Sequence, residues 1–136
     1  MIKAFQKEHK QVFDALKLIQ QAGIRSKQSR ETLRSIKNLL VNHLAKEDKT
    51  LYPLLLASND QTTRATAREY IKDMQVTSRV VLAFFDKYSS DNLTASQSLD
   101  ADFITDIITL MKKLQLRIAR EEKFLYPLAQ IEIDKK

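Results

Sequence analysis

Two stretches of sequence, HLAKEDKTLYPLL at residues 43–55 and RIAREEKFLYPLA at residues 117–129, follow the same pattern. Seven of their 13 aligned positions are identical, and the second stretch lies 74 residues after the first. Each stretch places a glutamate four residues after a basic or imidazole side chain, so the two side chains share one face of a helix. We interpret the chain as two helix hairpins that descend from one, with the two copies facing each other across a core.

Apolar residues recur at helical spacing in four blocks that include these stretches. Four amphipathic helices with short connections are typical of an all-α fold, the antiparallel up-down-up-down four-helix bundle. We expect the helices to cover about residues 2–22, 29–60, 62–88 and 100–131, with a loop over residues 89–98.

A few residues indicate where these helices end or bend. Gly23 is expected to follow the end of the first helix, and Ser29 is expected to cap the start of the second. Pro53 and Pro127 fall inside the second and fourth helices, where we expect a kink or a local break because proline lacks the backbone N–H.

Composition narrows the class of protein. The chain has 136 residues, which predicts a single domain, and one glycine and two prolines leave too few turn residues for a β fold. The absence of cysteine excludes disulfides, thiolate metal sites and cysteine nucleophiles.

The net charge of +6 is scattered and accompanies no nucleic-acid-binding motif, so nucleic acid is the least favoured partner. No signal peptide and no membrane-spanning stretch is evident, so we expect a cytoplasmic protein.

The residues that indicate function are polar side chains on the apolar stripes, which are the apolar faces of the four predicted helices. A buried carboxylate needs a cation, a hydrogen-bond network or a proton, and inward imidazoles and carboxylates are how helix bundles bind metals. Oxygen and nitrogen donors suit iron, manganese or zinc. The residues expected to converge in the core are His9, His43, Glu47, Arg117, Glu121 and, on the third helix, Gln75.

Other interpretations of these residues remain open. His9 can be a hydrogen-bonded core histidine instead of a metal ligand. Arg117 can extend to the surface with only its stem buried. Tyr52 and Tyr126 are expected to pack at the helix breaks, where a hydroxyl group can also orient a carboxylate.

The motifs resemble those of the hemerythrin-like family of HHE cation-binding domains. The resemblance rests on EH at residues 8–9, HLAKED followed by LYP within residues 43–53, and AREEKFLYP at residues 119–127. It implies a bundle with a non-haem di-iron centre, a histidine ligand on each of the first and third helices, and an HxxxE motif on each of the second and fourth. On this chain it implies metal ligands at His9, His43, Glu47 and Glu121.

The sequence departs from the family pattern at two positions. Arg117 stands where the fourth-helix histidine is expected, and Gln75, or else Arg79, stands at the third-helix position. A guanidinium keeps its charge and cannot ligate a metal, and like charges about 4 Å apart repel by several kcal/mol in a protein interior. Arg117 and a second metal ion should therefore exclude each other. We expect Gln75→His together with Arg117→His to restore two-metal binding.

The sequence therefore predicts a degenerate hemerythrin-like protein that binds a single non-haem metal ion, iron, and senses oxygen, nitric oxide or metal. The alternative is a metal-free bundle whose core is an Arg117–Glu47–Glu121 salt-bridge network and which acts by protein–protein contact. Its partner is then another protein or a second copy. Surplus apolar residues such as Val80, Val81 and Phe84 would allow the bundle to dimerise in either case. No nucleophile–base pair or phosphate-binding glycine loop is evident, so we expect no enzymatic activity.

Overall fold

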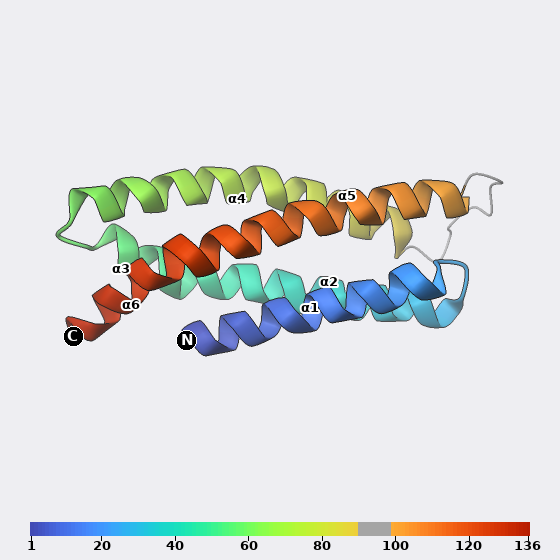
Figure 1. Ribbon diagram of the computed structural model, residues 1–136, viewed down its shortest axis with the longest axis horizontal. Helices are drawn as coiled ribbons and strands as arrows, with labels where there is room; N and C mark the ends of the chain where they lie inside the picture. The colour runs from blue at the N-terminus through green and yellow to red at the C-terminus, as the bar shows by residue number, and fades with distance from the viewer. Residues whose placement is uncertain (90–98) are drawn as a thin grey trace.

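The computed structural model describes residues 1–89 and 99–136, and all regular structure in these ranges is helical. Two short segments, η1 and η2, are π-helical and continue directly into α3 and α6. The chain therefore forms four antiparallel rods, with both termini at the same end (Figure 1). The elements are α1 (Ile2–Ala22), α2 (Lys27–Lys46), η1 (Glu47–Leu51), α3 (Tyr52–Leu56), α4 (Gln61–Tyr88), α5 (Leu99–Arg120), η2 (Glu121–Leu125) and α6 (Tyr126–Asp134).

The predicted all-α four-helix bundle is confirmed. α1 packs against both α2 and α5, and α4 packs against the same two helices, so α1 and α4 lie diagonally across the bundle. No helix within the described ranges is long and apolar enough to cross a membrane. Of the loop predicted for residues 89–98, only Ser89 lies within the described residues.

The core consists of two apolar layers with a polar layer between them. The larger layer fills the end with the α1–α2 turn, and the smaller one fills the end near the termini. Along α1, His9 falls between Phe5 of the smaller layer and Val12 of the larger one. The polar stripe residues therefore form a cross-section of the bundle that is sealed on both sides by apolar side chains.

Val81 and Phe84 belong to the larger apolar layer, where they are 2% and 7% exposed. The expectation that they form a dimer surface is wrong, because their face of α4 points into the bundle. Val80 is half-buried.

The start of α2 differs from the prediction. Ser26, rather than Ser29, is the N-cap, because its hydroxyl accepts a hydrogen bond from the backbone N–H of Ser29 at 3.0 Å and the helix begins at Lys27. Gly23 follows the end of α1, as expected, and has a φ of 85°, which favours glycine.

Pro53 and Pro127 do not break their rods. Each lies at the start of a short α-helix, directly after a π-helical segment. The backbone N–H of Tyr52 bonds to the carbonyl of Glu47, and that of Tyr126 bonds to the carbonyl of Glu121, one residue further back than in an α-helix. Both copies of the repeated motif therefore have the same local structure, with the glutamate at the first residue of the wide turn.

Candidate metal centre

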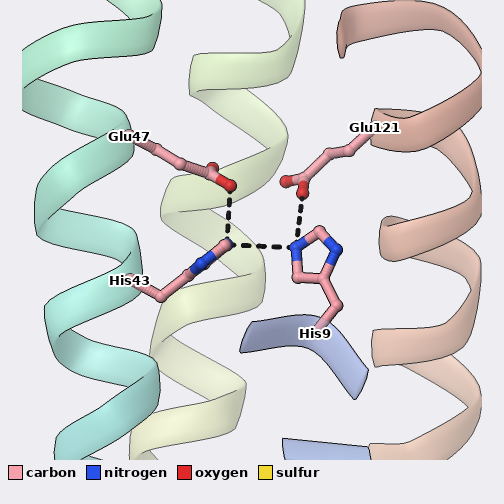
Figure 2. A group of neighbouring side chains, drawn as sticks. All are labelled: His9, His43, Glu47 and Glu121. Atoms are coloured by element: carbon pink, nitrogen blue, oxygen red, sulfur yellow. Dashed lines mark hydrogen bonds and ion pairs between the residues drawn. The ribbon is translucent and has the colours of Figure 1, made fainter. Parts of the chain in front are cut away.

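Four side chains converge in the polar layer from three of the rods. His9 comes from α1, His43 and Glu47 come from the α2–η1 rod, and Glu121 begins η2; Figure 2 shows them pointing toward one another. Each offers one ligand atom, and these atoms lie within 4.8 Å of one another. All four residues are buried, and Glu47 is fully so.

Three pairs of neighbouring ligand atoms lie close to the spacing that one metal ion requires. Nε2 of His43 is 2.7 Å from Oε1 of Glu47 and 3.0 Å from Nε2 of His9. Nε2 of His9 is in turn 3.2 Å from Oε2 of Glu121. Donor atoms that surround a single ion at about 2.1 Å lie roughly 3–3.5 Å apart, so the cluster fits one metal ion with small adjustments.

The hydroxyl of Tyr126 completes the cluster. It lies 2.9 Å from Oε1 of Glu47 and 3.1 Å from Oε2 of Glu121, and 3.2 Å from Nε2 of His9. The hydroxyl has one proton, so it can donate to only one of the two carboxylates at a time. Its burial raises the pKa of Tyr126, and the two carboxylates raise it further, which keeps the phenol protonated.

Two further carboxylates hold the outer nitrogens of the imidazoles. Nδ1 of His43 lies 3.2 Å from Glu8, and Nδ1 of His9 lies 3.3 Å from Glu122. A carboxylate on one ring nitrogen fixes the tautomer and directs the other nitrogen at the metal, as in most protein metal sites. Glu8 is itself anchored by the ammonium group of Lys46 at 3.0 Å.

These contacts leave the cluster short of positive charge. When Nδ1–H of each imidazole donates outward, both Nε2 lone pairs face the inner oxygens of the two carboxylates, and in the described residues these inner oxygens share one proton, that of the Tyr126 hydroxyl. The outer oxygen of Glu121 accepts from Arg117. In addition, Oε2 of Glu47 is buried with no hydrogen-bond partner in residues 1–89 and 99–136, and buried polar atoms rarely stay unpaired. Extra protons on the imidazoles or a metal ion would satisfy the cluster, and the donor set fits a metal.

Arg117 lies beside the cluster and does not extend into solvent. Its Nε donates to Oε1 of Glu121 at 2.8 Å, and its side chain is 11% exposed. Its terminal nitrogen donates to the hydroxyl of Tyr52 at 2.9 Å and to the carbonyl of Tyr70 at 3.1 Å. In the described residues its ion pair is with Glu121 and not with Glu47, so the expected three-residue salt-bridge network is only partly formed.

The two central carboxylates differ in their proton affinity. Burial raises the pKa of Glu47, and the neighbouring Glu121 adds to that rise against the opposing hydrogen bond with His43. Burial alone would also raise the pKa of Glu121, but His9 and Arg117 outweigh burial and lower it. For His43, burial lowers the pKa, whereas Glu47 and Glu8 raise it above its ordinary value. An added proton is therefore held more readily by Glu47 or His43 than by Glu121.

The expectation that Gln75, or else Arg79, faces the core from α4 is wrong. Gln75 and Arg79 are exposed, whereas Met74, one residue earlier, is 6% exposed and faces the core. A cavity of about 40 Å³ lies between α4 and the cluster, and His9, His43, Arg117 and Glu121 contribute to its wall. α4 contributes Met74, Thr77, Ser78 and Val81 to this cavity. The α4 residues that line the cavity beside the cluster are therefore apolar or hydroxyl side chains.

Sequence reasoning missed the roles of Glu8, Glu122 and, in part, Tyr126. Two signals pointed to them: Glu8 precedes His9 in the quoted EH motif, and the tyrosine is repeated in both LYP motifs. Neither signal shows which side chain of another helix the carboxylate or hydroxyl group contacts.

Comparison with known proteins identifies the family of the chain. The model of the Hemerythrin HHE cation binding domain family matches residues 1–129. No curated protein and no solved structure matched the chain. The family match covers nearly the full length, including all four rods and the four converging residues. The chain therefore belongs to the hemerythrin HHE cation-binding domain family.

Proposed function

We propose that this chain binds one divalent metal ion, iron, through His9, His43, Glu47 and Glu121, and that it serves as a non-catalytic sensor of oxygen, nitric oxide or metal. The observation that carries the proposal is the convergence of two imidazole nitrogens and two carboxylate oxygens with a single phenol proton among them. The unpaired Oε2 of Glu47 adds a further donor.

Charge balance supports one ion and argues against two. The carboxylates of Glu47 and Glu121 together with the guanidinium of Arg117 carry a net charge of −1. One divalent cation changes this to +1, whereas two would leave +3 in a buried site, which is strongly unfavourable at low dielectric. Arg117 also satisfies the carboxylate oxygen, Oε1 of Glu121, that a second ion would need.

The choice of iron as the metal rests on family membership. The nitrogen and oxygen donors of the cluster suit iron, zinc and manganese alike. A ferrous ion with an open coordination position supplies a binding site for a small diatomic molecule. The cavity of about 40 Å³ beside His9 and Glu121 supports the sensing role, because it exceeds the space that one water molecule requires.

Metal stoichiometry tests this proposal. Protein purified without a metal-affinity tag is loaded anaerobically with ferrous iron, freed of excess metal, and analysed for bound iron. We expect about one equivalent, strongly reduced in Glu47→Gln and His43→Gln. Asp48→Asn is the matched control, since Asp48 is the exposed neighbour of Glu47. Wild-type protein that retains no iron, zinc or manganese would overturn the proposal.

The second candidate is a metal-free bundle that acts through protein contacts. It is favoured by Arg117, whose three hydrogen bonds to Glu121, Tyr52 and Tyr70 require no metal. In that case protons on the imidazoles, rather than a metal ion, balance the carboxylates, and stability is the same with chelator and with added metal.

A further inference from the structure

The proposed metal cluster meets the protein surface through a groove between α1 and α5, here called the α1–α5 groove. Its volume is about 270 Å³, and its lining is Gln6, His9, Lys10, Phe13, Gln115, Ile118 and Glu122. His9 also lines the internal cavity beside the cluster. One proposed ligand is therefore in contact with both the groove and the interior.

Glu122 occupies the boundary between groove and cluster. Its carboxylate is 3.3 Å from Nδ1 of His9, and its side chain is 37% exposed. Glu8 has the equivalent contact with His43, but its side chain is 11% exposed and is paired with Lys46. The two carboxylates therefore hold their imidazoles in the same way, yet Glu122 is much more accessible to an ion in solvent.

A second groove, between α2 and α4, approaches the cluster from the opposite side. Its volume is about 330 Å³, and it has an acidic side chain, Asp48, in its lining. Leu44, Met74 and Ser78 line both this groove and the internal cavity, so two apolar side chains and one hydroxyl, with no carboxylate or imidazole, separate it from the ligands. A hydrated cation crossing this wall would lose its water before it gained a charged or imidazole ligand, which is costly.

We propose that the metal ion enters through the α1–α5 groove and that Glu122 is the carboxylate that first receives it and delivers it to His9. This inference rests on the proposed metal-binding function. The exposed carboxylate exchanges for water on the incoming ion while the ion is still partly hydrated. Rotation of the His9 ring away from Glu122 then transfers the ion inward. Lys10, exposed on the same groove, opposes the approach of a cation.

Rates of metal binding separate this role from simple support of His9. Association and dissociation of Co²⁺ are followed by stopped-flow absorption with the full chain. We expect Glu122→Gln to slow association roughly tenfold. Glu8→Gln is the matched control: it should weaken equilibrium binding by roughly tenfold or more through faster dissociation, with association unchanged.

Two more variants test the route itself. Lys10→Gln should speed association, because it removes a positive charge from the groove. Asp48→Asn, at the opposite groove, should leave the association rate unchanged. The inference is wrong if Glu122→Gln acts only on dissociation, as Glu8→Gln does, or if Asp48→Asn is the variant that slows association. Failure of the wild-type protein to bind any Co²⁺ would instead overturn the metal-binding function, and this inference with it.

Discussion

Tyr126 links both copies of the repeated glutamate, because its hydroxyl lies within 3.1 Å of Glu47 and of Glu121. Without metal, this hydroxyl is a neutral donor that the two buried carboxylates share. With metal, the ion itself would neutralise both carboxylates. The contribution of the hydroxyl to stability should therefore depend on whether metal is bound.

We predict that Tyr126→Phe lowers the free energy of unfolding of the metal-free protein by about 1–3 kcal/mol, since it removes a donor from a buried carboxylate. The loss should be smaller in the presence of Zn²⁺. Tyr52→Phe is the matched variant, because the Tyr52 hydroxyl accepts from Arg117 instead, so its effect should not depend on metal. Urea unfolding with and without Zn²⁺ measures both. Equal losses for Tyr126→Phe in the two conditions would contradict the prediction.

The four converging residues could be predicted because each lies on an apolar stripe that the structure buries. Gln75 could not be placed correctly because α4 has no sharp stripe near it: Met74 and Gln75 are adjacent, and either fits a helical repeat. Glu8 and Glu122 lie beside predicted ligands, but their contacts span helices far apart in sequence. Periodicity assigns a face to each residue, and it does not report such contacts.

The position of Met74 changes which α4 residue should be replaced by histidine to create a second metal site. We predict that Arg117→His combined with Met74→His binds close to two equivalents of metal, because both positions line the cavity beside the cluster. Arg117→His combined with Gln75→His should stay near one equivalent, since Gln75 is exposed. Elemental analysis after anaerobic loading distinguishes the two variants. Equal stoichiometry in both would show that the assignment of the α4 face is wrong.

Of the helices that carry cluster residues, α2 begins at a side-chain N-cap, whereas α1 does not. Ser26 accepts from the N–H of Ser29 at the start of α2, the helix that carries His43. We predict that Ser26→Ala lowers the free energy of unfolding by about 1 kcal/mol, the usual cost of losing an N-cap. Ser35→Ala, in the middle of the same helix, should change it little or raise it slightly, because alanine is the better helix former. Chemical denaturation followed by circular dichroism compares the two, and an equal loss in both would rule out the cap as the cause.

Helix positions could be predicted from the apolar periodicity to within one to three residues at most ends, as for α1 and α4. The π-helical segments could not. Proline predicts a disturbance because it lacks an N–H, but the form of the disturbance depends on what the neighbouring side chains must contact. Here the wide turn lets Glu47 and Tyr52 of one rod both face the polar layer, Glu47 in the cluster and Tyr52 against Arg117.

α4 and α5 are tied together far from the cluster by Asp106, which accepts hydrogen bonds from Tyr88 and from Lys87. The hydrogen bond from Tyr88 outweighs burial and lowers the pKa of Asp106, while burial and the Asp106 contact raise the pKa of Tyr88 to about 12. A carboxyl whose pKa is lower in the folded state stabilises the fold above its unfolded pKa of about 3.9. That stabilisation is lost as the pH falls through the folded-state pKa.

We predict that Asp106→Asn lowers the free energy of unfolding at neutral pH by ~1 kcal/mol at most, because the Asp106 side chain is 39% exposed and its ion pair is screened. The difference from wild type should shrink as the pH falls below about 4 and vanish once Asp106 is protonated in both states. Denaturation across this pH range measures the effect. A difference that stays constant at acid pH would show that the charge of Asp106 is not its source.

The bundle as a whole places a charged layer between two apolar layers, and this arrangement makes its stability sensitive to metal. A ligand that binds only the folded state stabilises it, by about 4 kcal/mol when free metal exceeds the dissociation constant a thousandfold. For a domain of this size we therefore predict that the melting temperature rises by roughly 10 °C or more with Fe²⁺ or Zn²⁺. The cause is that the ion replaces protons between His9, His43, Glu47 and Glu121.

The same measurement separates the two candidate functions. Chelator should return the melting temperature to the metal-free value, and His43→Gln should abolish most of the rise, since it removes one of the four donors. Ca²⁺ is the matched control ion, because it prefers all-oxygen ligands and should produce little change. If Fe²⁺, Zn²⁺ and chelator all leave the melting temperature unaltered, protons balance the buried carboxylates, and the bundle functions through its surface and not through a metal.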